Sequence, residues 1–89
     1  MVTKLAEKDA LLVKESLEFE NSIMELSLVE YKRRLKDFEQ KYNMKTKSFL
    51  EKFNSGELGD DEEWFDWLFV VKAYNHVKNR IDRIAILVK

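Results

Sequence analysis

Helix-breaking residues are almost absent from this chain, and their absence limits its possible folds more than any other property of the sequence. The 89 residues include no proline and only two glycines, Gly56 and Gly59. Because these two residue types most often end helices, a helical chain would be interrupted only around residues 54–59. We therefore predict an all-α fold in which two long helices form a hairpin through that region.

Apolar residues recur at helical spacing on both sides of the predicted loop. Steps of three and four residues are typical of a helix that packs one face on another helix. The stripe before the loop is Met24, Leu28, Tyr31, Leu35, Phe38 and Tyr42, and the stripe after it is Trp67, Val70, Tyr74, Val77, Ile81, Ile84 and Val88. These stripes predict one long helix over residues 22–43 and a second over residues 60–88.

Three polar residues fit the starts of helices. Ser22 is followed three residues later by a glutamate, which is typical of a capping box. Thr46 fits the cap of a short connecting helix over residues 46–54. Asp60 fits the cap of the last helix, whose acidic first turn would face the positive end of the helix dipole. The sequence thus predicts three separate helices after residue 21.

Residues 1–20 are predicted to form an N-terminal helical extension, because Leu5, Leu12 and Phe19 recur every seven residues. The alternative is a β-hairpin. Apolar residues also alternate with polar ones on either side of residues 20–22, and such alternation is typical of strands joined by a turn.

Charged residues are grouped in four blocks of alternating sign, although the formal net charge is only −1. Residues 7–30 carry seven acids and two bases, and residues 32–52 carry eight bases and three acids. Residues 60–66 carry five acids, and residues 72–89 carry five bases and one acid. An antiparallel hairpin, with Tyr42 near Trp64, sets opposite blocks side by side, whereas a parallel one sets like against like. The charge pattern therefore favours the antiparallel hairpin.

The N-terminal part of the chain is too long for the last helix to cover. At a rise of 1.5 Å per residue, a helix from Thr3 to Tyr42 would span roughly 60 Å and the last helix roughly 42 Å. The apolar residues of the N-terminal third would then have to fold back, join another subunit or bind a different protein. We expect either a small protein partner or a second copy of the chain.

The residues expected to contact that partner lie in the extension and at the start of the last helix. Aromatic residues often concentrate binding energy, although contact with Tyr42, Phe49 and Phe53 in the core is the simpler interpretation for most of the aromatic ones. The predicted partner-binding residues are Leu5, Leu12, Phe19, Trp64, Phe65 and Phe69.

A basic run offers an alternative surface for nucleic acid, because lysine and arginine neutralise phosphates. An ordinary solvated helix face paired with acids is the favoured interpretation of the run, and no DNA-binding or RNA-binding motif accompanies it. Nucleic acid is therefore the less favoured partner. The residues of this run are Lys32, Arg33, Arg34, Lys36, Lys45 and Lys47.

No catalytic, cofactor or metal site is predicted, and we expect neither an enzyme nor a small-molecule substrate. The chain has no cysteine, and no carboxylate close in the sequence would orient its one histidine, His76. The acidic run of residues 60–63 lacks the alternating ligands and central glycine of a calcium loop. No stretch approaches the roughly 18 apolar residues of a membrane span. The absence of cysteine fits the cytoplasm, which is the expected compartment.

Four motifs resemble a family of small, uncharacterised bacterial and archaeal helical proteins. The family has a long helix, a KYGM-like junction, a short helix, a GELGDD-like turn and an aromatic-rich last helix, and the resemblance covers about residues 31–84. Asn43 stands where a glycine is common, but asparagine tolerates the left-handed backbone of a helix end. The motifs are Lys41-Tyr42-Asn43-Met44, Ser48-Phe49-Leu50-Glu51-Lys52-Phe53, Ser55-Gly56-Glu57-Leu58-Gly59-Asp60-Asp61 and Trp64-Phe65-Asp66-Trp67.

Genes of this family often lie beside genes of small toxin-like proteins. The resemblance therefore implies an antitoxin-like protein that binds and masks another protein, and it implies no catalytic residue. We predict a cytoplasmic, oligomeric protein–protein interaction module. The alternatives are a nucleic-acid-binding regulatory protein and a structural homodimer.

Overall fold

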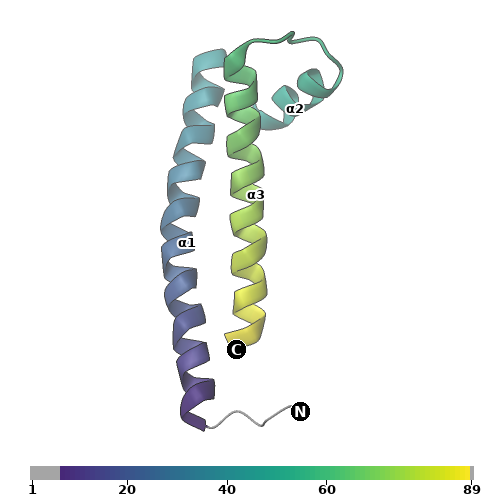
Figure 1. The fold of residues 1–89 in the computed structure, drawn as a ribbon. Coiled ribbons are helices and arrows are strands. Elements are labelled where there is room, and N and C mark those ends of the chain that lie inside the picture. Colours follow the sequence, from purple (N-terminus) through teal and green to yellow (C-terminus); the bar gives the residue numbers. More distant parts are fainter. Residues whose placement is uncertain (1–6, 89) are drawn as a thin grey trace.

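The computed structural model of the chain describes residues 7–88, which form three helices and no strand. Helix α1 spans Glu7–Tyr42, α2 spans Thr46–Asn54 and α3 spans Glu62–Val88. Figure 1 shows α1 and α3 side by side, with the short α2 beside the end of the hairpin at which they are joined. The all-α helical hairpin predicted from the sequence is confirmed.

Contacts between α1 and α3 fix an antiparallel register. At the closed end, the ring centroids of Tyr42 and Trp64 lie 4.6 Å apart, as the sequence predicts. Opposite charges meet at both ends of the hairpin. The ion pairs between the two helices are Lys41 Nζ with Glu63 Oε1 at 2.7 Å and Arg80 Nε with Glu20 Oε1 at 3.2 Å. The predicted pairing of basic with acidic blocks is therefore confirmed.

Helix α1 continues without interruption through Asn21 and Ser22, where two helices were expected to meet. The Ser22 hydroxyl donates a hydrogen bond to the carbonyl oxygen of Glu18, 3.1 Å away, as serines inside helices do. The predicted helix start at Ser22 is therefore wrong, and so is the alternative β-hairpin. The surrounding sequence is rich in glutamate and leucine, which favour helix, and a capping residue does not stop a helix that can continue.

The N-terminal extension is part of α1 from Glu7 onwards, and residues 1–6 lie outside the described residues. Because Arg80 pairs with Glu20, the end of α3 eight residues later lies level with about Leu12 of α1. The overhang of α1 is thus confined to the residues before about Leu12. Phe19, which was expected in the overhang, lies alongside α3.

The junction between α1 and α2 is held by backbone geometry and one carboxylate. Asn43 has a φ of 49°, which confirms the predicted left-handed helix end, and the N–H of Met44 donates to the carbonyl oxygen of Glu39 at 3.1 Å. The Glu39 carboxylate accepts a hydrogen bond from the N–H of Thr46 at 2.8 Å and so caps α2 from α1. The predicted role of the Thr46 hydroxyl as a cap is wrong, because that hydroxyl accepts a hydrogen bond from Trp67 Nε1 at 3.3 Å.

The start of α3 also differs from the prediction by a small shift. Asp61, and not Asp60, caps the helix: its Oδ1 accepts a hydrogen bond from the N–H of Glu63, 2.9 Å away. The helix therefore begins at Glu62. Several consecutive carboxylates are similar as caps, so local chemistry does not choose among them. The turn before the helix contains two glycines with positive φ, Gly56 at 81° and Gly59 at 79°.

The core is an aromatic stack at the closed end of the hairpin. The Trp67 side chain is fully buried between two nearly parallel rings, Phe49 with its centroid 4.1 Å away and Phe38 with its centroid 5.3 Å away. The other buried apolar side chains are Val70, Val71 and Ile84. None of the residues of α1 is fully buried, so α1 contributes half-buried side chains such as Phe38 to a core whose fully buried side chains come from α2 and α3.

The Glu39 cap predicts a pH dependence of stability. The backbone hydrogen bond from Thr46 holds the pKa of the Glu39 carboxyl below its ordinary value of 4.5. A carboxyl with a lowered folded-state pKa stabilises the fold above its ordinary pKa and loses that contribution as the pH falls through the lowered value. Glu39→Gln should lower the free energy of unfolding by about 1 kcal/mol at neutral pH, and the difference should disappear well below pH 4.5.

Urea denaturation across this pH range measures the effect. Glu51→Gln is the matched control, because it removes an exposed carboxylate from α2 itself and should change stability by no more than about 0.5 kcal/mol. A Glu39→Gln difference that stays constant with pH would contradict the capping role.

Candidate interaction surfaces

Exposed apolar residues of α1 form a stripe on the side turned away from α3. This stripe, the α1 outer face, consists of Leu12, Phe19, Ile23 and Leu26. Their exposed fractions lie between 50% and 73%. Successive residues of a helix turn by about 100°, which places these four on one face. Leu17, Met24 and Leu28 point in roughly the opposite direction and are half-buried, so α1 has two apolar faces.

The α1 outer face is not covered by any other described part of the chain. In Figure 1, α2 and α3 both lie on the same side of α1. Leu11 and Val29 are also exposed and lie to one side of the stripe, whereas the exposed Val13 points towards the α3 side of α1. Exposed apolar residues that share one helix face in this way are typical of a protein interaction site, although the exposed Glu15 and Ser16 separate Leu12 from the other three.

Only part of this surface was predicted from the sequence. Leu12 and Phe19 belong to the predicted partner-binding set, and Leu5 lies outside the described residues. Ile23 and Leu26 were missed, because the helix start expected at Ser22 placed them on a different helix from Phe19. Steps of seven, four and three residues from Leu12 onwards would have identified them if α1 had been treated as continuous.

The aromatic residues at the start of α3 divide between core and surface. Trp64 is half-buried, packs against Tyr42 and donates a hydrogen bond from Nε1 to the carbonyl oxygen of Leu58 at 3.1 Å. Trp64 is therefore a core residue, as predicted by the interpretation that most of these aromatic residues contact Tyr42, Phe49 and Phe53. Phe65 and Phe69 are exposed, although the ring of Phe65 also packs edge-on against Phe53 of α2, with 5.5 Å between the centroids.

The structure does not bring the two halves of the predicted partner-binding set together. Trp67 stacks on Phe38, which places Phe69 near the C-terminal part of α1. Phe38 and Phe19 are roughly 30 Å apart along α1 at 1.5 Å per residue. Phe65 and Phe69 thus form a second surface, the α3 aromatic surface, separate from the α1 outer face.

The basic run is partly neutralised by acids of the same hairpin. Arg33 Nη1 lies 2.7 Å from Asp37 Oδ2, and Arg33 Nε lies 3.2 Å from Glu30 Oε2. Lys41, which lies within the same part of the chain, is paired as well. Its hydrogen bond to Glu63, together with that from the Tyr42 hydroxyl, holds the pKa of the Glu63 carboxyl below its ordinary value. Since the attraction to phosphate grows with unpaired positive charge, these contacts weaken this run as a nucleic-acid surface. The remaining residues of the run are Lys32, Lys36, Lys45 and Lys47, which are exposed, and Arg34, which is half-buried.

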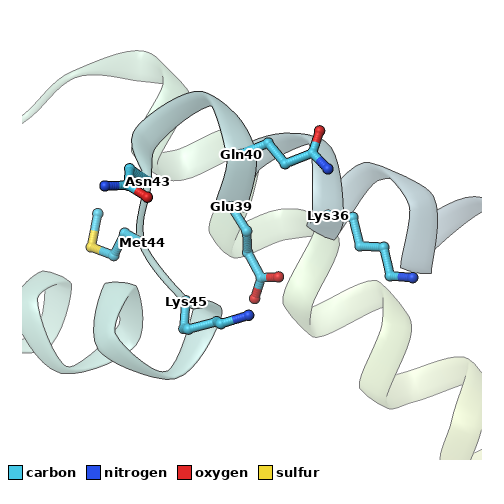
Figure 2. A pocket seen from close by; sticks show the side chains of 6 residues that line it. All are labelled: Lys36, Glu39, Gln40, Asn43, Met44 and Lys45. Atoms are coloured by element: carbon cyan, nitrogen blue, oxygen red, sulfur yellow. The ribbon is translucent and has the colours of Figure 1, made fainter.

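A shallow hollow lies at the junction of α1 and α2 (Figure 2). Its lining residues are Lys36, Glu39, Gln40, Asn43, Met44 and Lys45. The carboxylate of Glu39 lies between the two lysines, as Figure 2 shows, and is held by its hydrogen bond to α2. A carboxylate in this position repels anions, so the two lysines do not form a phosphate site.

Metal-binding and membrane-spanning features are not found among residues 7–88. In this range, no three His, Cys, Asp or Glu side chains are grouped so that they could hold a metal ion. No described helix is long and apolar enough to cross a membrane. His76 is exposed on α3. The sites that the described residues do offer are surfaces.

Comparison of the chain with protein-family models, with curated proteins and with solved structures gave no match. Its class is therefore defined by the fold, an all-α antiparallel hairpin of two long helices with a short connecting helix.

Proposed function

We propose that this protein is a protein–protein interaction module without enzymatic activity, and that it buries the α1 outer face against another protein chain. The observation that supports this proposal is that four exposed apolar residues share one face of α1, on the side away from α3. Full burial of one leucine, isoleucine or phenylalanine side chain contributes about 1.5–3 kcal/mol. Four such residues on one face therefore provide a strong drive towards association.

The proposed role is antitoxin-like, in that the protein would bind and mask a small partner protein. The motifs around Tyr42 and Trp64 that resemble the small bacterial and archaeal family support this part of the proposal. We propose the cytoplasm as the compartment, because the chain contains no cysteine. Nucleic-acid binding through the basic run is the weaker proposal, since Arg33 is engaged by two acids of its own helix.

Leu12→Asp combined with Phe19→Asp is expected to abolish binding of the partner. Both side chains are exposed in the described structure, so the helical content should not change, whereas two carboxylates would be buried in the interface at a high desolvation cost. The test is to purify the tagged chain from its native host and to weigh the complex by light scattering. The wild-type complex should exceed the 10.7 kDa of the chain, and that of the variant should not.

The matched control is Phe65→Asp combined with Phe69→Asp, which places the same charges on the α3 aromatic surface. We expect the complex to survive in this control. A complex that is lost in the control but survives in the α1 variant would assign binding to the α3 aromatic surface instead. Salt-sensitive binding of DNA or RNA by the purified chain would favour the nucleic-acid alternative.

A further inference from the structure

The middle part of α1 is strongly acidic. Residues 15–30 include five glutamates and no lysine, arginine or histidine. Two of these glutamates are paired within the hairpin, Glu20 with Arg80 of α3 and Glu30 with Arg33 one turn later. The other three are exposed and form no ion pair within residues 7–88. This acidic flank consists of Glu15, Glu18 and Glu25.

The acidic flank lies along one side of the α1 outer face. At 100° per residue, Glu15 lies roughly 40° round the helix from Phe19. Glu18 and Glu25 follow in the same direction at roughly 100° and 120°. Lys14, the nearest base in the sequence, lies roughly 140° from Phe19 and so points further away from the apolar residues. A chain that covers the outer face therefore meets three carboxylates along one side of its contact.

The apolar part of the outer face has a defined length. Leu12 and Leu26 are roughly 21 Å apart along the helix axis at 1.5 Å per residue. Beyond Leu26, the same face carries Glu30 and Asp37, which are joined through Arg33 by ion pairs. The steps of seven, four and three residues from Leu12 to Leu26 match the spacing of a helix that packs on another helix. The surface therefore fits a partner helix of about four turns.

The acidic flank selects the charge of that helix. An unpaired carboxylate that loses its water without gaining a partner charge is costly, and a second negative charge beside it adds repulsion. A base on the partner avoids both costs, and opposite charges also speed the encounter of the two chains. The partner helix therefore needs lysines or arginines on the side that faces the flank.

We infer that the partner binds through a basic amphipathic helix of about four turns, whose apolar residues cover the α1 outer face and whose lysines or arginines face Glu15, Glu18 and Glu25. This inference rests on the proposed function, because it names the chemistry of the partner for the same surface.

Two synthetic peptides test the charge preference directly. The basic peptide has about 15 residues, leucines at heptad spacing and three lysines along one side, and its acidic twin has glutamates in place of the lysines. Fluorescence anisotropy at about 50 mM salt should show a dissociation constant at least tenfold lower for the basic peptide, and the difference should shrink as salt is added. Equal binding, preference for the acidic twin, or no binding of the basic peptide up to about 1 mM would overturn the inference.

Charge reversal of the acidic flank should reverse the preference. The variant carries Glu15→Lys, Glu18→Lys and Glu25→Lys, and it should bind the acidic twin at least about tenfold more tightly than the basic peptide. All three side chains are exposed, so the helical content measured by circular dichroism should not change. Glutamine at the same three positions should remove most of the preference and leave the helices equally intact. A preference that is unchanged in both variants would overturn the inference.

A matched control changes the net charge by the same amount at the closed end of the hairpin. It carries Glu57→Lys, Asp60→Lys and Asp66→Lys, three exposed positions in and after the turn before α3. This control should keep the preference for the basic peptide. A reversed preference in the control would mean that the peptide responds to net charge or binds near the α3 aromatic surface, and either result would overturn the inference.

Failure of this inference differs from failure of the proposed function. If the wild-type chain does not discriminate between the peptides but its native complex is lost in the Leu12→Asp, Phe19→Asp variant, the inference fails and the proposed function stands. If that variant keeps the native complex, the proposed function fails. A purified chain with a mass of twice 10.7 kDa that Phe19→Asp returns to a monomer would assign the face to a second copy and overturn the inference.

Discussion

Trp67→Ala is expected to lower the free energy of unfolding by about 3–5 kcal/mol, the largest effect of any substitution considered for this chain. The Trp67 side chain is fully buried, and its ring lies between the rings of Phe49 and Phe38. Alanine would leave a cavity between the two rings and remove the hydrogen bond to Thr46. Since small domains are stable by only about 5–15 kcal/mol, the variant should be close to unfolding at room temperature.

Phe69→Ala is the matched control for Trp67→Ala. It removes an aromatic ring from the same helix two residues later, but that ring is 62% exposed, so the change in stability should stay within about 0.5 kcal/mol. Urea denaturation followed by circular dichroism measures both. Equal losses in the two variants would show that Trp67 does not occupy the centre of the core.

Ile84→Ala is expected to cost about 2–5 kcal/mol. Ile84 is 1% exposed and lies in the part of α3 near the open end of the hairpin, level with about Leu17 of α1. The substitution therefore tests whether α3 packs on α1 far from the aromatic stack. The same denaturation experiment reports the result.

Ile86→Ala is the control for Ile84→Ala, because the same side chain is removed two residues later from a position that is 74% exposed. Its effect should remain within about 0.5 kcal/mol. A similarly small effect of Ile84→Ala would mean that the last turns of α3 do not pack on α1.

Periodicity and charge were sufficient to predict the hairpin and its direction. The apolar stripe that ends at Tyr42 and the one that begins at Trp67 identify the faces that pack, and the four charge blocks choose the antiparallel register. The ion pair between Arg80 and Glu20 confirms that choice. These predictions succeed because they depend on residue spacing and charge over many positions.

Helix boundaries were predicted less well, because they depend on contacts that are distant in the sequence. The cap of α2 comes from Glu39 of α1, and no local pattern around Thr46 indicates a carboxylate seven residues earlier. Ser22 has the chemistry of a cap but lies within a continuous helix. A capping pattern states where a helix could begin, whereas the helix propensity of the flanking residues decides whether the preceding helix ends.

Two of the four residues of the α1 outer face were predicted from the sequence. Leu12 and Phe19 were identified from their seven-residue spacing, whereas Ile23 and Leu26 became part of the same surface only when α1 proved to be one helix. The sequence also does not show which of the neighbours Trp64 and Phe65 is exposed; in the structure Trp64 is half-buried and Phe65 is exposed. Their different environments depend on which side of α3 meets α1 and α2.

The accessibility of a cysteine on the α1 outer face tests most directly whether another chain covers it. The natural chain has no cysteine, so a single thiol introduced by Leu26→Cys or by Phe69→Cys reports one position only. In the described chain, Leu26 is 73% exposed and Phe69 is 62% exposed, so the fold itself protects neither. Labelling rates with a thiol reagent would be measured on each protein as purified from its native host and again after denaturation. Protection of the Leu26→Cys thiol together with rapid labelling of the Phe69→Cys thiol is the predicted result, whereas equally rapid labelling of both would contradict the proposal that α1 is an interaction surface.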